Sequence, residues 1–372
     1  SFIYSDLSAA QFDQTTIFSF FDPNTGQQQG VNLSGTNATL TGLTGMIDFR
    51  GVNLAGVSFS ASDLSIAQFD QTTIFSFLDP NSGQQQGVNL SGTNAMLTGL
   101  TGMIDFRGVN LAGVSFSGSD LSSAQFDQTT IFSFLDPYTG QQHGVNLSST
   151  NAMLTGLSGN IDFRGVNLTG VSFSASDLSS AQFDQTTVFS DGANGVNLSG
   201  TNAVLSNLSG TVMFGGANLS GVSFQNSDLS GAMFTIDTIF SQADPVTGQI
   251  SAVDLSGTNA LIALLGAIDF REVNLSGANL TNSDLSSALL TGAIFNNSTT
   301  WPSGFDPITA GAINTDANSG PTGGSSGTDD NNTIFVVSGG DFNAPFYNFT
   351  YESNGSSVDF QSTSLKKGNT YI

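Results

Sequence analysis

The chain contains no cysteine, one histidine and only 6 lysines and arginines among its 372 residues. The absence of cysteine excludes disulfides, thiolate chemistry and cysteine-ligated metal. The single histidine, His143, cannot supply a Ser–His–Asp arrangement in each of several repeats, and we interpret it as a surface variant. Charged residues make up 9% of the chain, far below the roughly 25% of ordinary soluble domains.

The few charges that are present are mostly acidic, and the formal net charge is −23. This charge disfavours direct binding to nucleic acid or to an anionic membrane, and no apolar run is long enough to insert into a membrane. Lysine and glutamate, which favour helices, are scarce, whereas the strand-favouring residues are plentiful. With 31 phenylalanines the chain can bury a large core, so low charge does not indicate disorder here. We expect an all-β protein.

The sequence repeats itself. Residues 1–57, 58–114 and 115–171 are near copies of one another, 172–222 and 223–278 are shorter copies, and 279–301 is a partial sixth. Within each copy a large apolar residue recurs about every five positions, as at Phe59, Leu64, Phe69 and Ile74. Neither a helix nor a regular strand has this period. It indicates a backbone that turns a corner every five residues.

These blocks of five resemble the pentapeptide-repeat family. The resemblance covers residues 1 to about 300 and rests on blocks such as VNLSG at 88–92, VNLAG at 109–113, SDLSS at 119–123, AQFDQ at 124–128 and ANLSG at 217–221. It implies a right-handed, four-sided parallel β-helix, or β-solenoid, with four blocks per coil. The resemblance also suggests a bacterial source, in particular a cyanobacterium. Ten blocks per copy give two and a half coils, so consecutive copies are rotated by half a turn.

Numbering the four faces predicts two opposed phenylalanine stacks flanked by aliphatic residues such as Ile74 and Ile131. One stack contains Phe59, Phe106, Phe126, Phe173 and Phe214, and the other contains Phe69, Phe116, Phe163, Phe183 and Phe224.

Six-residue insertions interrupt four copies, in segments that begin at Phe21, Leu78, Leu135 and Ala243. Each contains Asp-Pro followed one residue later by Thr-Gly or Ser-Gly, which is typical of tight turns. We expect each insertion to form a short hairpin that projects from the solenoid, and we expect the hairpins of successive copies to project from opposite sides. After 301 we expect Trp301 and Phe305 to cover the last coil, and a Gly/Ser/Asp linker at 302–332. Residues 333–372 resemble an incomplete β-sandwich, with some similarity to cupredoxin-like domains.

An arginine follows a central phenylalanine in three copies, and an aspartate does so one coil later. We therefore predict three salt bridges between coils, namely Arg50 with Asp70, Arg107 with Asp127, and Arg164 with Asp184. Asp13 occupies the same aspartate position without a preceding arginine. We interpret Phe2 and Asp13 as a candidate end-to-end interface, at which further repeats or another subunit would supply the arginine.

The remaining polar residues give weaker signals. The aspartates of the SDLS blocks offer a calcium site only if they cluster, and the half-turn rotation scatters them: Asp6, Asp63, Asp120, Asp177, Asp228 and Asp284. No nucleophile–base pair, metal cluster or phosphate loop is evident, so we expect no enzymatic activity and no cofactor.

The favoured function is structural. We expect an extracellular or cell-surface rod that self-associates, end to end or laterally, into a filament, or that forms part of a long adhesive protein. A phage tail-fibre segment is a variant of this hypothesis. An alternative from another class is an acidic DNA mimic that acts on gyrase, as some proteins of the resembled family do.

Overall fold

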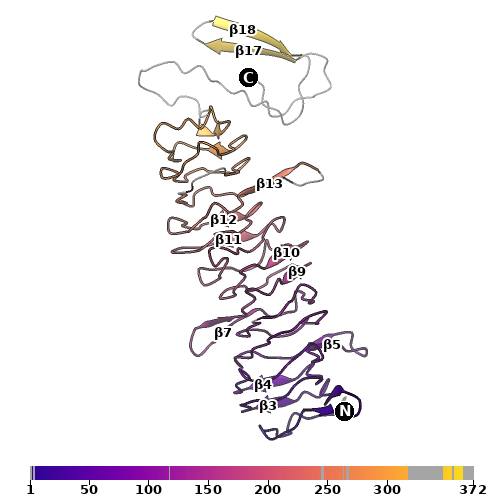
Figure 1. Cartoon of the computed structure of the whole chain (residues 1–372). Helices are drawn as coiled ribbons and strands as arrows, with labels where there is room; N and C mark the ends of the chain where they lie inside the picture. Colours follow the sequence, from indigo (N-terminus) through magenta and orange to yellow (C-terminus); the bar gives the residue numbers. More distant parts are fainter. Residues whose placement is uncertain are drawn as a thin grey trace. The chain divides into compact units, whose positions relative to one another are not determined.

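The computed structural model describes residues 2, 5–116, 118–243, 247–262, 264, 268–316, 347–353 and 356–362, and these contain no α-helix. The chain divides into two compact units, Ser1–Asn314 and Thr315–Ile372. The first unit is a β-solenoid whose coils follow one another in sequence order (Figure 1). It extends past 301, where we expected the repeats to end, because β15 (Ile294–Phe295) pairs in parallel with β16 (Ile313–Asn314). The linker expected to begin at residue 302 therefore begins later, because residues up to Asn314 belong to the solenoid.

Successive coils pair through short parallel strands and single bridges. The paired strands are β3 (Thr39–Thr41) with β4 (Ser58–Ser60), β9 (Met153–Thr155) with β10 (Ser172–Ser174), and β11 (Val204–Ser206) with β12 (Ser223–Gln225). Within one coil, pairing starts from Leu40, Thr44, Asp48 and Asn53. The coil therefore has four paired sides, and almost no strand is longer than one side.

The five-residue block owes its shape to two hydrogen bonds. In the block that contains Asp63 and Leu64, the Asp63 carboxylate accepts a hydrogen bond from the backbone N–H of Ser65, at 3.1 Å. The Leu64 side chain is fully buried, and its carbonyl accepts the N–H of Ala67, at 3.1 Å. Aspartate and asparagine favour such turns. This explains why one of them so often precedes the central apolar residue.

The inserted segments form antiparallel hairpins, as the turn chemistry predicts. They are β1 (Ser19–Asp22) with β2 (Gln27–Gly30), β5 (Ser76–Leu78) with β6 (Gln85–Gly87), β7 (Ser133–Leu135) with β8 (Gln142–Gly144), and β13 (Ser241–Ala243) with β14 (Ile250–Ala252). The β5 and β7 hairpins leave the stack on opposite sides (Figure 1). The copy that lacks the insertion has only a short turn there, closed by a Ser190–Gly195 bridge.

Phenylalanine rings run through the core as one continuous path. In a typical stretch, Phe75 lies 5.2 Å from Phe106, measured between ring centroids, and Phe106 lies 5.4 Å from Phe126. Such runs of three join through corner contacts like that of Phe126 with Phe132, at 5.9 Å. The path links Phe12, Phe18, Phe49, Phe69, Phe75, Phe106, Phe126, Phe132, Phe163, Phe183, Phe189, Phe214, Phe234, Phe240 and Phe270.

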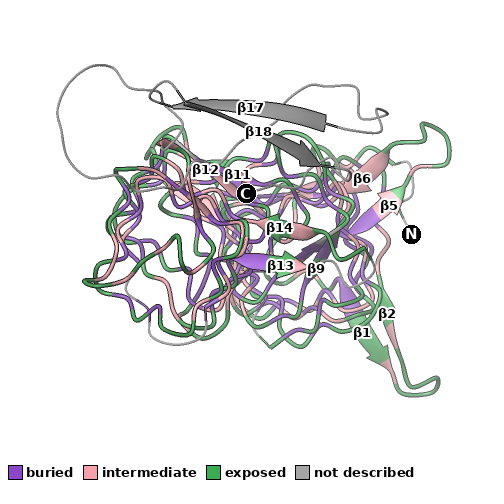
Figure 2. Cartoon of the chain, turned by 90° about the horizontal axis from the view of Figure 1, so that it is seen from above, coloured by how far each residue is buried: buried purple, intermediate pink, exposed green. Residues whose placement is uncertain are grey.

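The expected separation into two opposed stacks is wrong. Phe126 belongs to one expected stack and Phe163 to the other, yet the ring path joins them through Phe132, with centroid distances of 5.9 and 5.2 Å. Burial follows the pattern nonetheless. Buried stretches, drawn in purple, recur along the coils (Figure 2). Every candidate core phenylalanine is buried: Phe59, Phe69, Phe106, Phe116, Phe126, Phe163, Phe173, Phe183, Phe214 and Phe224.

The aliphatic positions before the hairpins are also corrected. Ile74 and Ile131 were expected inside, but they are 44% and 45% exposed, whereas Phe75 and Phe132 are 1% exposed. The corner before Ile74 takes one extra residue, because the buried hydroxyl of Thr73 donates to the Phe49 carbonyl, at 3.0 Å. This shift turns Phe75 inward.

The second unit contributes an antiparallel pair, β17 (Tyr347–Ser353) with β18 (Ser356–Ser362). The expected sandwich and most of the linker lie outside the described residues. At the end of the first unit, the partly buried rings of Trp301 and Phe305 stack at 5.7 Å and pack against the core.

Candidate functional sites on the coil surface

Each arginine of the IDFR blocks pairs with the aspartate two residues before it. In a strand, alternate side chains share a face, so Asp105 and Arg107 point outward while Phe106 is buried. The Arg107 Nε lies 2.9 Å from Asp105 Oδ1, and Nη2 lies 2.8 Å from Oδ2. This two-pronged geometry is the strong form of the pair. It recurs for Arg50 with Asp48, Arg164 with Asp162, and Arg271 with Asp269.

The predicted salt bridges between coils are therefore wrong. Among the described residues, Asp70, Asp127 and Asp184 form no ion pair with Arg50, Arg107 or Arg164. The Asp127 carboxylate instead accepts the N–H and hydroxyl of Thr129, at 2.9 and 2.5 Å. The pKa of Arg107 is raised first by its hydrogen bond to Asp105, and the charge of Asp127 adds least. Asp127 is thus a neighbour and not the partner.

The correct partner had a signal in the sequence. In the fourth copy both members of the pair are lost together, as Met213 and Gly215 stand in their places. In the fifth copy Asp269 and Arg271 are both kept, although Thr291 occupies the position one coil later. The arginine therefore varies with the aspartate two residues before it.

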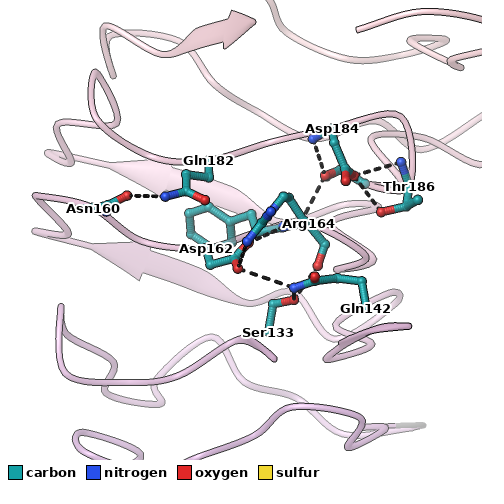
Figure 3. Close-up of polar contacts among 10 residues, drawn as sticks. Ser133, Gln142, Asn160, Asp162, Arg164, Gln182, Asp184 and Thr186 are labelled. Carbon is teal, nitrogen blue, oxygen red and sulfur yellow. Dashed lines mark hydrogen bonds and ion pairs between the residues drawn. The ribbon is translucent and has the colours of Figure 1, made fainter. Parts of the chain in front are cut away.

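The Arg–Asp pair also anchors the hairpin of the preceding coil. Gln85 Nε2 donates to Asp105 Oδ2, at 3.1 Å, and to the Ser76 hydroxyl, at 2.6 Å. That hydroxyl donates to the Arg107 carbonyl. Figure 3 shows the same network in the third copy, with Ser133, Gln142, Asp162 and Arg164. Because Ser76 and Gln85 lie on the two hairpin strands, the network fixes the hairpin base.

Burial alone would raise the pKa of Asp105, but the hydrogen bonds from Arg107 outweigh it and lower the pKa below its ordinary value. Asp48 and Asp269 show the same balance. The carboxylates therefore stay ionised and hold a structural pair at neutral pH.

The hairpins carry exposed apolar side chains. Phe20 and Phe21 are 58% and 60% exposed in the first hairpin, and Phe134 and Leu135 are 43% and 48% exposed in the third. Tyr138 at the tip of the third is almost fully exposed. His143 lies opposite Phe134 across this hairpin. Paired apolar side chains on a protruding hairpin are typical of contact surfaces.

The SDLS aspartates serve their own turns. Asp63, for example, is exposed, and its pKa is lowered by hydrogen bonds from Ser65. Among the described residues no three His, Cys, Asp or Glu side chains come together as a metal site would require. The calcium hypothesis thus finds no cluster in that part of the chain.

Phe2 and Asp13 are the two residues of the candidate end-to-end interface. Phe2 is about half exposed. Asp13 accepts hydrogen bonds from the N–H and hydroxyl of Thr15, at 2.9 and 2.6 Å, just as Asp127 does with Thr129. The argument that Asp13 needs an arginine from elsewhere is therefore wrong, because its equivalents have no arginine partner either.

Stacked coils, a filled core and turn-forming aspartates define a β-solenoid repeat protein. The family model described as pentapeptide repeats matches in 8 copies, over residues 104–131, 159–188, 194–231 and 265–299. In these four segments the chain matches the pentapeptide-repeat family. No helix long and apolar enough to cross a membrane occurs among the described residues.

Solved structures that are similar to this chain include the following two. One is a trypsin-treated form of QnrB1, a plasmid-mediated fluoroquinolone resistance protein, with 17% identity over 71% of this chain and 90% of that chain, and a TM-score of 0.14. The other is the pentapeptide repeat protein Rfr23 from the cyanobacterium Cyanothece 51142, with 19% identity over 53% of this chain and 90% of that chain, and a TM-score of 0.11. No curated protein matches.

Proposed function

We propose that the chain is a non-enzymatic structural rod that self-associates into a filament or forms part of a long surface protein. The observation that carries the proposal is the ring path, which runs without interruption from Phe12 to Phe270 through successive copies. Each copy adds coils to one shared core, so tandem copies extend the stack at little cost in new design. The four-sided, right-handed course implied by the family suits such a rod.

The surface supports association more than catalysis. The hairpins present apolar pairs at intervals along the stack, and the polar network holds their bases in place. We place the protein outside the cell or on its surface, where low charge density and the lack of cysteine are both tolerated. Protease treatment of intact cells tests this location: the chain should be cut while a cytoplasmic marker stays intact, and protection of the chain would contradict it.

Negative-stain electron microscopy of the native material tests the rod hypothesis. Continuous filaments are the expected result. Uniform short rods that stay separate at high concentration would contradict it.

A second candidate, a DNA mimic that acts on gyrase, is favoured by the net charge of −23. Against it, the acids are not arranged in continuous rows: Asp63 bridges to Thr44 and Asp105 bridges to Gln125 on the next coil. A supercoiling assay with gyrase separates the two functions. Potent inhibition by the full chain would support mimicry, and no inhibition at high concentration would exclude it.

A further inference from the structure

One row of side chains that begins in the fourth copy is entirely apolar, whereas the equivalent rows elsewhere contain a charged residue. The row consists of Val188, Met213 and Met233. Each of them directly precedes a phenylalanine of the core, and these phenylalanines are three consecutive members of the ring path: Phe189, Phe214 and Phe234. Those rings lie 5.2 and 5.6 Å apart on successive coils, and Met213 bridges directly to Met233. The three side chains therefore form a row, which we call the Met face. They are 40%, 37% and 51% exposed.

The same row carries an aspartate in every other copy. The equivalent rows are Ile74, Asp105 and Gln125, which begins in the second copy, Ile131, Asp162 and Gln182, which begins in the third, and Ile239, Asp269 and Leu289, which begins in the fifth. There the aspartate is paired with an arginine, and in the second and third copies the hairpin glutamine contacts it. The fourth copy has lost the aspartate, the arginine and the hairpin together.

The loss of the hairpin uncovers the Met face. Gly192 of the short turn that replaces it lies close to the row, because a Cβ placed there would lie 3.3 Å from Met213 Cε. Gly215, in place of arginine, offers no side chain to cover the row. An apolar face that contains no ionisable group is thus left open, on a chain that is otherwise strongly acidic.

We propose that the Met face binds an apolar hairpin from a second copy of this chain. The hairpins supply matching chemistry: exposed Phe and Leu side chains on short strands whose own residues are uncharged in β7 and β5. In the equivalent row of the other copies a docking hairpin would cover an Arg–Asp pair, and desolvating that pair costs free energy. On the Met face apolar side chains meet apolar side chains without burying such a pair.

The contact joins two different surfaces, so it does not close on itself. A hairpin of one chain occupies the Met face of the next, whose own hairpins remain free, and repetition gives an open filament. This inference rests on the proposed self-association and names the surface responsible. Because each chain carries a large negative charge, the contact strengthens as salt screens the repulsion between chains.

The test compares full-length chains by sedimentation velocity over a series of salt concentrations. Met213→Gln with Met233→Gln makes the Met face polar, and glutamine is the natural residue at the position of Met233 in the four preceding copies. We expect at least about a tenfold loss in association constant. Leu289→Gln is the matched control, because Leu289 is 52% exposed beside the Arg271–Asp269 pair. It should change the association constant by less than about twofold.

A complementation experiment tests the hairpin side. Phe20, Phe21, Phe77, Leu78, Phe134 and Leu135 are replaced by the Gln and Ala that the fifth-copy hairpin carries at Gln242 and Ala243. This chain and the Met-face variant should each stay single alone and form pairs when mixed. If the wild type associates and the Met-face variant associates equally, this inference fails while the rod function stands. If the wild type never associates, both fail.

Discussion

The guanidinium of Arg107 lies 2.8 Å from the Asp105 carboxylate of its own coil and not against Asp127 of the next. The pair thus joins neighbouring residues of one strand, and the coils are held together by backbone bridges and the core. Through Gln85 and Ser76 the same pair fixes the base of a hairpin. The charge pattern therefore serves the display of hairpins more than the stacking of coils.

A double-mutant cycle tests this partner choice. Arg107→Gln combined with Asp105→Asn should show a coupling free energy of about 0.5–1 kcal/mol, because the half-exposed pair has two-pronged geometry. Arg107→Gln combined with Asp127→Asn should show no coupling, because asparagine keeps the turn with Thr129. Urea unfolding of six chains, namely the wild type, the three single variants and the two double variants, gives both values. A larger coupling with Asp127 would restore the inter-coil bridge.

The corrected corner makes a prediction about the core. Phe132→Ala should destabilise the stack by about 3–5 kcal/mol, because it empties a fully buried ring position. Ile131→Ala, one residue earlier, should cost less than about 1 kcal/mol because that side chain is half exposed. Thermal unfolding measures both. A larger effect at Ile131 would support the regular five-residue spacing instead.

The hairpin anchor predicts a local effect. Gln85→Ala removes the hydrogen bonds to Asp105 and Ser76, so amides of β5 and β6 should exchange with solvent faster by about tenfold, which corresponds to about 1.4 kcal/mol. Gln84→Ala changes a neighbouring exposed glutamine and serves as the control. Equal exchange in the two variants would show that the network does not hold the hairpin.

Acid should weaken the fold in a defined direction. The pKa values of Asp48, Asp105 and Asp269 are lowered in the folded chain, since hydrogen bonds from arginine outweigh burial. A lowered folded pKa means that the stabilisation is present above the unfolded value of 3.8 and is lost as pH falls through the folded pKa. Unfolding midpoints should therefore drop below about pH 4.

Asp105→Asn provides the comparison for that pH series. The difference in midpoint between wild type and variant should be constant at neutral pH and should shrink in acid, where the wild-type carboxylate is also uncharged. A difference that persists unchanged to the lowest pH would contradict the assignment of a lowered pKa to Asp105.

Much of the fold was predictable because each five-residue block is a local unit. The turn at Asp63 and the buried Leu64 follow from chemistry within five residues, and the Asp-Pro turns predict the hairpins directly. The spacing of one coil correctly aligned Phe106 with Phe126, whose rings stack at 5.4 Å.

The errors arose where local chemistry departs from the period. The corner that contains Thr73 has one residue more than the five-residue period allows. Ile74 therefore points outward and Phe75 inward. Because both residues are apolar, hydrophobicity alone does not predict which of them is buried. The spacing of one coil predicted Asp127 as the partner of Arg107. The actual partner, Asp105, lies only two residues before Arg107, where alternate side chains point the same way. The Met face was not predicted because its three residues come from three successive coils and lie 20 or more residues apart in the sequence.

Cryo-electron microscopy of the native material, at a resolution that separates neighbouring coils, tests the central claim most directly. The account predicts filaments of stacked coils about 4.8 Å apart, with an apolar hairpin of one chain seated on Val188, Met213 and Met233 of the next. Single rods whose hairpins and Met face touch no other chain would contradict it.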